Sequence, residues 1–112
     1  MESVAISKYN RISAQKVRLV ADEIRGSELP DAIDVLKAIP RKASRLILKT
    51  LYSAGANAKY KNPEILEGKL YIKKITVDVA PTLKRFMARA RGRGTRIRKR
   101  MCNILIVLSD EN

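Results

Sequence analysis

The chain has 112 residues, of which 46% are hydrophobic, a composition that predicts one packed domain and excludes a disordered chain. Its 24 Lys and Arg against 11 Asp and Glu give a net charge of +13, which favours a polyanionic partner, with nucleic acid as the first candidate. The sequence has no His and a single Cys, which argues against a His-based catalytic site or a zinc cluster, and we expect no enzymatic activity, metal or cofactor.

The first predicted elements are a short strand at residues 4–6 and a helix over 14–25. Ser13 stands where a hydroxyl caps the free amides of a first turn, and Gly26 stands where a left-handed C-cap is favoured. Leu19 lies outside the apolar stripe of this helix, so we expect it to contact something other than the core. The stripe itself follows helical spacing through Val17, Val20, Ala21 and Ile24.

Two further helices follow, each with a proline near its predicted start. Pro30 fits the first turn of a short helix, and Pro40 ends that helix and can open the next one. Apolar residues at helical spacing give both helices a buried face. These faces comprise Ala32, Ile33, Leu36 and Ile39 in the second helix, and Ala43, Leu46, Ile47, Leu51, Ala54 and Ala58 in the third.

The third helix also carries a basic stripe on the side opposite its apolar arc. A plain solvated face usually mixes Glu with Lys, but residues 35–63 contain seven Lys and Arg and no Asp or Glu. We therefore predict that the stripe binds an anionic surface, and a merely solvated face stays open as the alternative. Its members are Arg41, Arg45, Lys49, Tyr52 and Lys59.

Past a loop at 62–68, the period of the apolar pattern changes from 3.6 to 2. Ile75, Val77 and Val79 alternate with polar residues, which predicts a half-buried strand. The last strand, over 104–108, is apolar on both faces and is predicted to be central. The predicted fold class is therefore α+β, with three helices packed on a small antiparallel sheet.

The most basic segment of the chain lies between these two strands. Residues 84–100 hold nine Lys and Arg, seven of them Arg, and no Asp or Glu. Guanidinium groups fork onto phosphates and keep their charge when desolvated. We therefore predict that this segment enters RNA and reads its shape and phosphate positions more than its base sequence.

The same segment is predicted to form one long β-hairpin. Pairing Val79 with Ile104 puts the tip at about 91–95, close to Gly92 and Gly94, where positive φ is needed. The ribbon has too few apolar side chains for a core of its own, so it must project from the domain or be ordered by an anion. The chain is then a single domain, 1–112, with a globular body (1–80 and 101–112) and an extended arm (about 81–100).

Four stretches of the sequence resemble one known family. They are SAQKVRLVADEIRG (13–26), PRKASRLILKTLYSAGANA (40–58), VDVAPTLKRFMARARGRGTRIRKR (77–100) and ILIVLSD (104–110). In this order, over nearly the whole chain, they resemble the universal large-subunit ribosomal protein family numbered twenty-two, in its bacterial or organellar form. The resemblance implies a structural constituent of the large ribosomal subunit that binds large-subunit ribosomal RNA and supports assembly of the subunit.

The resemblance also implies where the chain works. Members place the body near the exit of the nascent-peptide tunnel and the hairpin along the tunnel wall, so we expect large-subunit ribosomal RNA, neighbouring ribosomal proteins and the nascent polypeptide as partners. We expect no membrane partner and no homo-oligomer. The expected location is the cytoplasmic ribosome, or an organellar matrix or stroma if the source is an organelle. The implied tunnel-lining residues are Met87, Ala88, Arg89, Ala90, Arg91, Gly92 and Arg93.

The candidate RNA-binding residues combine cations of the body with those of the arm, and Asn57 joins them through the resemblance. No catalytic and no metal-binding residue is predicted. The body residues are Arg11, Lys16, Arg18, Arg25, Arg41, Lys42, Arg45, Lys49, Asn57 and Lys59. The arm residues are Lys84, Arg85, Arg89, Arg91, Arg93, Arg96, Arg98, Lys99 and Arg100.

The chain departs from the family pattern at Ala80, Ala88 and Cys102-Asn103, where the family commonly has Gly, Pro and Ser-His. The missing His removes one candidate RNA contact, and Cys102 is predicted to pack as a small, partly buried residue and not to serve as a reactive thiol. The alternative function is a free RNA-binding regulator or RNA chaperone that uses the same arm. A ribosomal protein co-sediments with the large subunit in near one-to-one amount, whereas a free regulator is recovered outside it.

Overall fold

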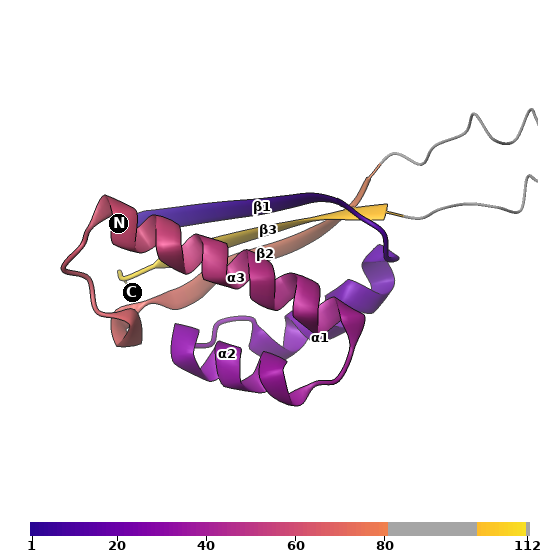
Figure 1. Cartoon of the computed structure of the whole chain (residues 1–112), viewed down its shortest axis with the longest axis horizontal. Helices are drawn as coiled ribbons and strands as arrows, with labels where there is room; N and C mark the ends of the chain where they lie inside the picture. The colour runs from indigo at the N-terminus through magenta and orange to yellow at the C-terminus, as the bar shows by residue number, and fades with distance from the viewer. Residues whose placement is uncertain (81–100, 112) are drawn as a thin grey trace, which may run out of the picture.

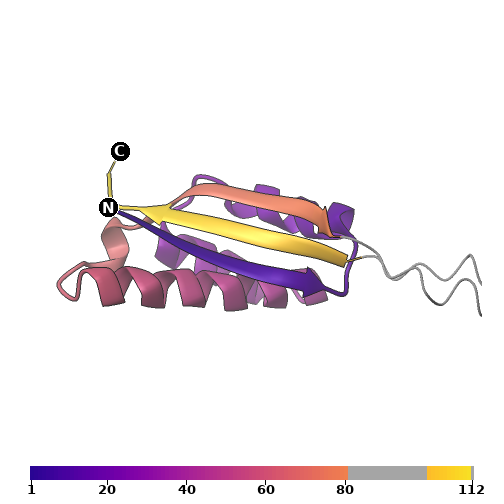
Figure 2. The same ribbon diagram turned by 90° about the horizontal axis from the view of Figure 1, so that it is seen from above.

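A three-stranded antiparallel sheet carries three helices on one of its faces (Figures 1 and 2). The computed structural model describes residues 1–80 and 101–111. The arrangement confirms the predicted α+β class and the order of one strand, three helices and two strands. The predicted hairpin over 81–100 lies outside the described residues. None of the helices described is long and apolar enough to cross a membrane.

The sheet places the last strand of the chain in the middle. Strand β3 (Met101–Ser109) pairs on one side with β1 (Glu2–Asn10) and on the other with β2 (Tyr71–Ala80). Its residues Ile104, Ile106 and Leu108 are fully buried, and Val107 on the opposite face is buried as well. Because β3 has a neighbouring strand on each edge, its predicted central position is confirmed.

The helices cover the sheet in two steps. Helix α1 (Ala14–Ile24) packs on β2, and α3 (Lys42–Lys61) packs across β1 and β3. Helix α2 (Leu29–Ala38) packs on α1, on α3 and on the short 3-10 helix η1 (Glu67–Lys69). As predicted, α2 has a proline in its first turn and ends before the next one.

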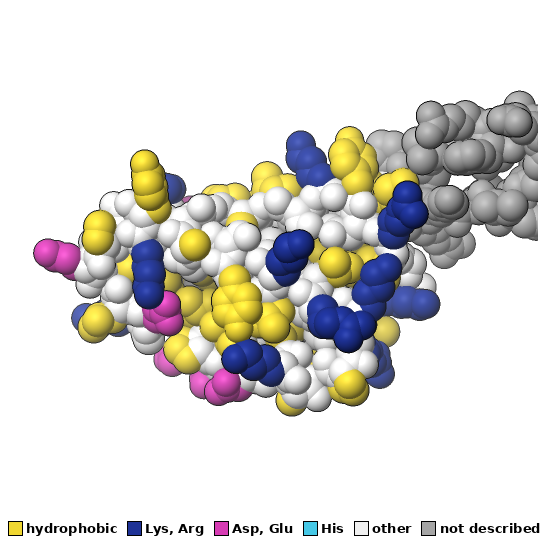
Figure 3. All heavy atoms as spheres, viewed as in Figure 1, with side chains coloured by type: hydrophobic (Ala, Val, Ile, Leu, Met, Phe, Trp, Pro, Cys, Tyr) yellow, Lys and Arg dark blue, Asp and Glu magenta, His cyan; other side chains and the backbone are white. Residues whose placement is uncertain are grey.

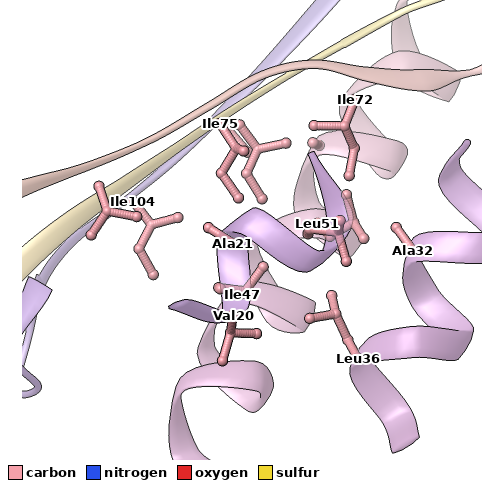
Figure 4. Close-up of a cluster of buried hydrophobic side chains, with 14 of the residues drawn as sticks. Val20, Ala21, Ala32, Leu36, Ile47, Leu51, Ile72, Ile75 and Ile104 are labelled. Carbon is pink, nitrogen blue, oxygen red and sulfur yellow. The ribbon is translucent and has the colours of Figure 1, made fainter. Parts of the chain in front are cut away.

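One hydrophobic core joins all the elements. Figure 4 shows side chains from the three helices and from two strands meeting between the helices and the sheet. Apolar residues recur at a period of 3.6 in the helices and of 2 in the strands. Each helix and strand therefore turns an apolar face toward this core. The labelled members are Val20, Ala21, Ala32, Leu36, Ile47, Leu51, Ile72, Ile75 and Ile104.

The two predicted caps of α1 have different outcomes. Gly26 takes a φ of +81°, the left-handed conformation expected at the end of this helix. Ser13 occupies the N-cap with extended backbone, but its hydroxyl makes no capping hydrogen bond, so the predicted capping role is wrong. The Ser13 side chain lines a surface groove instead.

The predicted strand register is wrong by two residues. Val79 lies opposite Cys102 and Val77 lies opposite Ile104, whereas the sequence analysis paired Val79 with Ile104. A long connection does not fix the register of the strands that it joins, so the buried pair of Ile75 and Ile106 fixes it instead. A shift of two residues keeps every side chain on its predicted face.

Val79 is another correction. It is 70% exposed, although its alternation with polar residues predicts a buried position. Val77, two residues earlier on the same face, is buried. Alternation assigns a residue to a face of the sheet but does not show how much of that face the helices cover.

A bulge in β1 creates an unusual backbone conformation at Tyr9. Its φ is +58°, and the register of β1 on β3 shifts between Ser7 and Asn10. The side-chain oxygen of Asn103 accepts a hydrogen bond of 2.8 Å from the Tyr9 amide. Asn103 therefore stabilises the bulge in β1.

Candidate nucleic-acid interface

The first half of α3 presents a row of free cations. Arg41, Arg45 and Lys49 follow one another at a spacing of four residues, and all three are exposed. None of them forms an ion pair within residues 1–80 and 101–111. Beneath the row, the buried Ser44 hydroxyl lies 2.6 Å from the carbonyl oxygens of Ile39 and Arg41, which fixes the start of the helix.

The second half of α3 differs from the sequence-based expectation. Lys59 forms an ion pair of 2.8 Å with Glu67 of η1, so the statement that this stripe has no acid to pair with is wrong. Residues 35–63 lack acids, but the fold brings one from outside that range. Tyr52, the aromatic member of the stripe, lines an apolar hollow between α2 and α3 with Leu29 and Ile33. The free cations are thus confined to the first half of the helix.

Asn57 is engaged within the protein. Its side-chain amide donates a hydrogen bond of 2.9 Å to the carbonyl oxygen of Val4 in β1. Two neighbours on the same edge do likewise: Lys61 donates to the Glu2 carbonyl at 2.9 Å, and the Ser3 hydroxyl donates to the Ala54 carbonyl at 2.7 Å. These bonds fasten α3 to the outer edge of β1.

Two predicted RNA-binding arginines of α1 are also engaged within the protein. Arg18 donates from Nε and Nη2 to the Val77 carbonyl, at 3.1 and 2.8 Å. Arg25 donates to the Ile75 carbonyl at 2.6 Å and to the Asp22 carboxylate at 3.2 Å. Both carbonyls face outward from β2, which is an edge strand, so the two arginines fasten α1 to that edge.

Free cations gather at one end of the body. Arg11, Lys16 and Lys42 lie around Arg41 at the starts of α1 and α3, where the four side chains line a common groove. Figure 3 shows Lys and Arg gathered over this end of the face, while Asp and Glu lie over α2 and toward the far end of α3. A surface of one sign with unpaired charges attracts a polyanion.

Charges at the opposite end of the body are paired with each other. The Met1 amine donates to the carboxylates of Asp110 and Glu111 at 3.1 and 3.0 Å, and Glu111 followed by Asp110 raises the pKa of the amine. Lys73 pairs with the Glu2 carboxylate, which lowers the pKa of Glu2 and raises that of Lys73. These five groups sum to a net charge of −1, which leaves the starts of α1 and α3 as the basic end.

The remaining chemistry of the body is unreactive. Cys102 is fully buried, whereas partial burial was predicted, and this burial raises the pKa of its thiol. Among the residues that the structure describes, no group of three or more His, Cys, Asp and Glu is placed to hold a metal ion.

The arm residues of the sequence analysis cannot be placed. The nine cations from Lys84 to Arg100 and the implied tunnel residues from Met87 to Arg93 lie outside the described residues. What the structure does place is their two attachment points, because Ala80 and Met101 lie opposite each other in neighbouring strands. The end of β2 and the start of β3 lie at the same end of the body as the start of α1 (Figure 1).

Comparisons with known proteins cover nearly the whole chain. The sequence profile of the family described as Ribosomal protein L22p/L17e matches residues 5–109. The chain is 49% identical to the Large ribosomal subunit protein uL22 of Leptospira biflexa, over 98% of this chain and 95% of that protein. The protein of the same name from Deinococcus radiodurans is 49% identical, over 96% of this chain and 79% of its own length. That of Chloroflexus aggregans is 46% identical, over 100% and 98% respectively.

Proposed function

The chain belongs to the ribosomal protein L22p/L17e family, and on this premise we propose that it is a constituent of the large ribosomal subunit that binds large-subunit ribosomal RNA. The relatives named above are bacterial, so the proposed location is the cytoplasmic ribosome of a bacterium. The proposed role is structural, in translation, without catalysis. Its partners are ribosomal RNA and neighbouring ribosomal proteins.

One structural observation carries the RNA-binding part of this proposal. The exposed cations Arg41, Arg45 and Lys49 have no acidic partner among the described residues, and they adjoin the groove at the start of α3. Cations that neutralise phosphates release condensed counterions, which supplies most of the affinity of basic proteins for nucleic acid. Unpaired surface cations contribute little to folding, so binding is the better account of their presence.

The segment 81–100 carries the second part of the proposal. We propose that it forms a hairpin that lines the nascent-peptide tunnel, with Met87 to Arg93 nearest the passing polypeptide. Support comes from the pairing of Ala80 with Met101, since two adjacent antiparallel ends suit a hairpin. Further support comes from the acid-free composition of 84–100, which suits a path between phosphates.

Sedimentation tests the ribosomal assignment against that of a free RNA-binding regulator. The full chain is expressed with a small epitope tag in a bacterium that lacks its own copy, and lysates are separated on sucrose gradients. We expect near one-to-one recovery with the large subunit and little protein in the free fractions. Recovery mainly in the free fractions, with large subunits that lack the protein, favours the regulator.

A further inference from the structure

A groove runs between the starts of α1 and α3. It has a volume of about 560 Å³, within the range of sites that hold small organic groups. Its lining includes four cations, Arg11, Lys16, Arg41 and Lys42. Apolar side chains, among them Ile12 and Leu19, line it as well.

The four cations of the groove are suited to bind a phosphate group. None of them forms an ion pair among the described residues, and no Asp or Glu lines the groove. The Lys42 ammonium donates a hydrogen bond of 3.1 Å to the Arg11 carbonyl, which links the start of α3 to the segment before α1. The positive ends of two helix dipoles add to this potential, and at α1 the Ser13 hydroxyl does not cap the free amides.

Phosphate binding does not explain the apolar side chains that line the groove. Leu19 is 59% exposed on a helix whose other large apolar residues are buried, so it does not serve the core. Ile12 beside it is half-buried. A phosphate ion alone would make no favourable contact with these apolar side chains. A group that joins a phosphate to a flat apolar face can contact both the cations and the apolar side chains of the groove.

We infer that this groove binds one unpaired nucleotide of large-subunit ribosomal RNA, with its phosphate on the four cations and its base against Leu19 and Ile12. The inference rests on the proposed function and adds to it a defined site. An unpaired nucleotide is required because bases inside an A-form helix are stacked and present no free face. An acidic, apolar protein tail is the competing occupant, and it is disfavoured by the number of unpaired cations in so small a space.

Two matched pairs of variants test the site through RNA affinity. Leu19→Ala is compared with Leu66→Ala, because Leu66 is 62% exposed and lies in the loop before η1, away from the groove. Lys16→Ala is compared with Lys69→Ala, an exposed cation of η1. The full chain and each variant are titrated with a transcript of the large-subunit ribosomal RNA of Leptospira biflexa at several salt concentrations, after thermal melts have shown equal folding.

The two groove variants should differ in how their RNA affinity depends on salt. Leu19→Ala should weaken binding by about threefold to tenfold without changing the salt dependence, since it removes only apolar contact. Lys16→Ala should weaken binding and lower the slope of log K against log salt by about 0.7, the value for one phosphate of a single strand. Both control variants should bind within about twofold of the parent chain, the scatter expected of neutral surface changes.

Cross-linking in the assembled subunit decides between RNA and protein as the occupant. The native Cys102 is fully buried, so a photoreactive thiol reagent attaches selectively to the variant Leu19→Cys. Leu66→Cys serves as the control. Attachment of the residue 19 probe to an RNA nucleotide supports the inference, whereas attachment to a protein, or no RNA attachment, overturns it.

The possible failures are distinguishable. If the parent chain does not bind the transcript in a salt-dependent manner, the proposed RNA-binding function is wrong. If the parent binds and the groove variants match their controls, the function stands and the groove is not a nucleotide site.

Discussion

The guanidinium of Arg18 donates two hydrogen bonds to the backbone carbonyl of Val77, from Nε at 3.1 Å and from Nη2 at 2.8 Å. A residue that was predicted to contact RNA thus donates two hydrogen bonds to the edge of its own sheet. The same holds for Arg25 and for Asn57, which bond to Ile75 and Val4. Part of the positive charge of the body therefore has a structural role.

This division of roles predicts opposite effects for two arginines. Arg18→Ala should lower the free energy of unfolding by about 1–2 kcal/mol, because it removes charge-assisted hydrogen bonds to the sheet edge. Arg45→Ala, at an exposed side chain without an ion pair, should change it by less than about 0.5 kcal/mol. Urea denaturation measures both. In RNA titration the order should reverse, with Arg45→Ala the weaker binder, and equal unfolding energies for the two variants would contradict the assignment.

Charge reversal on α3 tests the proposed anchoring surface. Replacing Arg41, Arg45 and Lys49 with Glu sets three negative charges against phosphates, so incorporation into large subunits should fall at least about tenfold. Sedimentation of subunits from cells that express the variant measures this. The control reverses three exposed cations elsewhere on the body and should incorporate like the parent; it combines Lys37→Glu, Lys69→Glu and Lys74→Glu. Equal loss in both variants would mean that net charge, not position, governs assembly.

The tip of the proposed hairpin should act on the nascent chain. Replacing Arg89, Arg91 and Arg93 with Ala removes charge from the passage but leaves the cations of α3 in place, so we expect near-normal assembly and altered stalling on an arrest peptide. A stalling reporter and gradient sedimentation are read on the same strain. Poor assembly with unchanged stalling would make these residues anchors and would remove the tunnel role proposed here.

The body should fold without the segment 81–100. Because Ala80 and Met101 are paired in the sheet, an Asn-Gly turn can join them directly as a two-residue hairpin loop. The three helices and three strands that surround the core are all kept in the shortened chain. The shortened chain should therefore keep a cooperative thermal transition, and a broad non-cooperative melt would show that the segment contributes to the core.

The pairing of the two chain ends makes stability depend on pH in the alkaline range. Glu111 and Asp110 raise the pKa of the Met1 amine above its ordinary value of 8.0. The charged amine is favoured in the folded state, so its contribution is complete below pH 8 and is lost as pH rises through the higher folded pKa. The urea midpoint measured between pH 7 and 10 should fall over this range. An N-terminally acetylated chain carries no such charge and should lack this part of the decline.

The sequence was most informative where a pattern is local. The stripe from Val17 to Ile24 and the alternation of Ile75 with Val77 predict elements and faces correctly, because each repeats within one helix or strand. Leu19 stood outside its stripe, and it lines the groove on the surface. The exposure of Val79 and the strand register depend on distant packing, which local periodicity does not contain.

The hydrogen bonds that fasten the helices to the sheet were not predictable. Arg18 and Val77 are 59 positions apart, and Asn57 and Val4 are 53 apart. Nothing in the residues around Arg18 or Asn57 distinguishes a side chain that bonds to a strand from one that meets solvent or RNA. The pair of Lys59 with Glu67 has the same origin, since it joins a helix to a turn that comes after it in the chain.

The fastened strand edges have a consequence for the free protein before it meets RNA. On β2, the Ile72 amide donates to Ser27 and the Ile75 and Val77 carbonyls accept from arginines, while on β1 the Glu2 and Val4 carbonyls accept from α3. A further strand from a second copy would have to displace these bonds before it could pair. The two edges of the sheet are thereby less open to pairing with a strand of a second copy, which disfavours edge-to-edge aggregation.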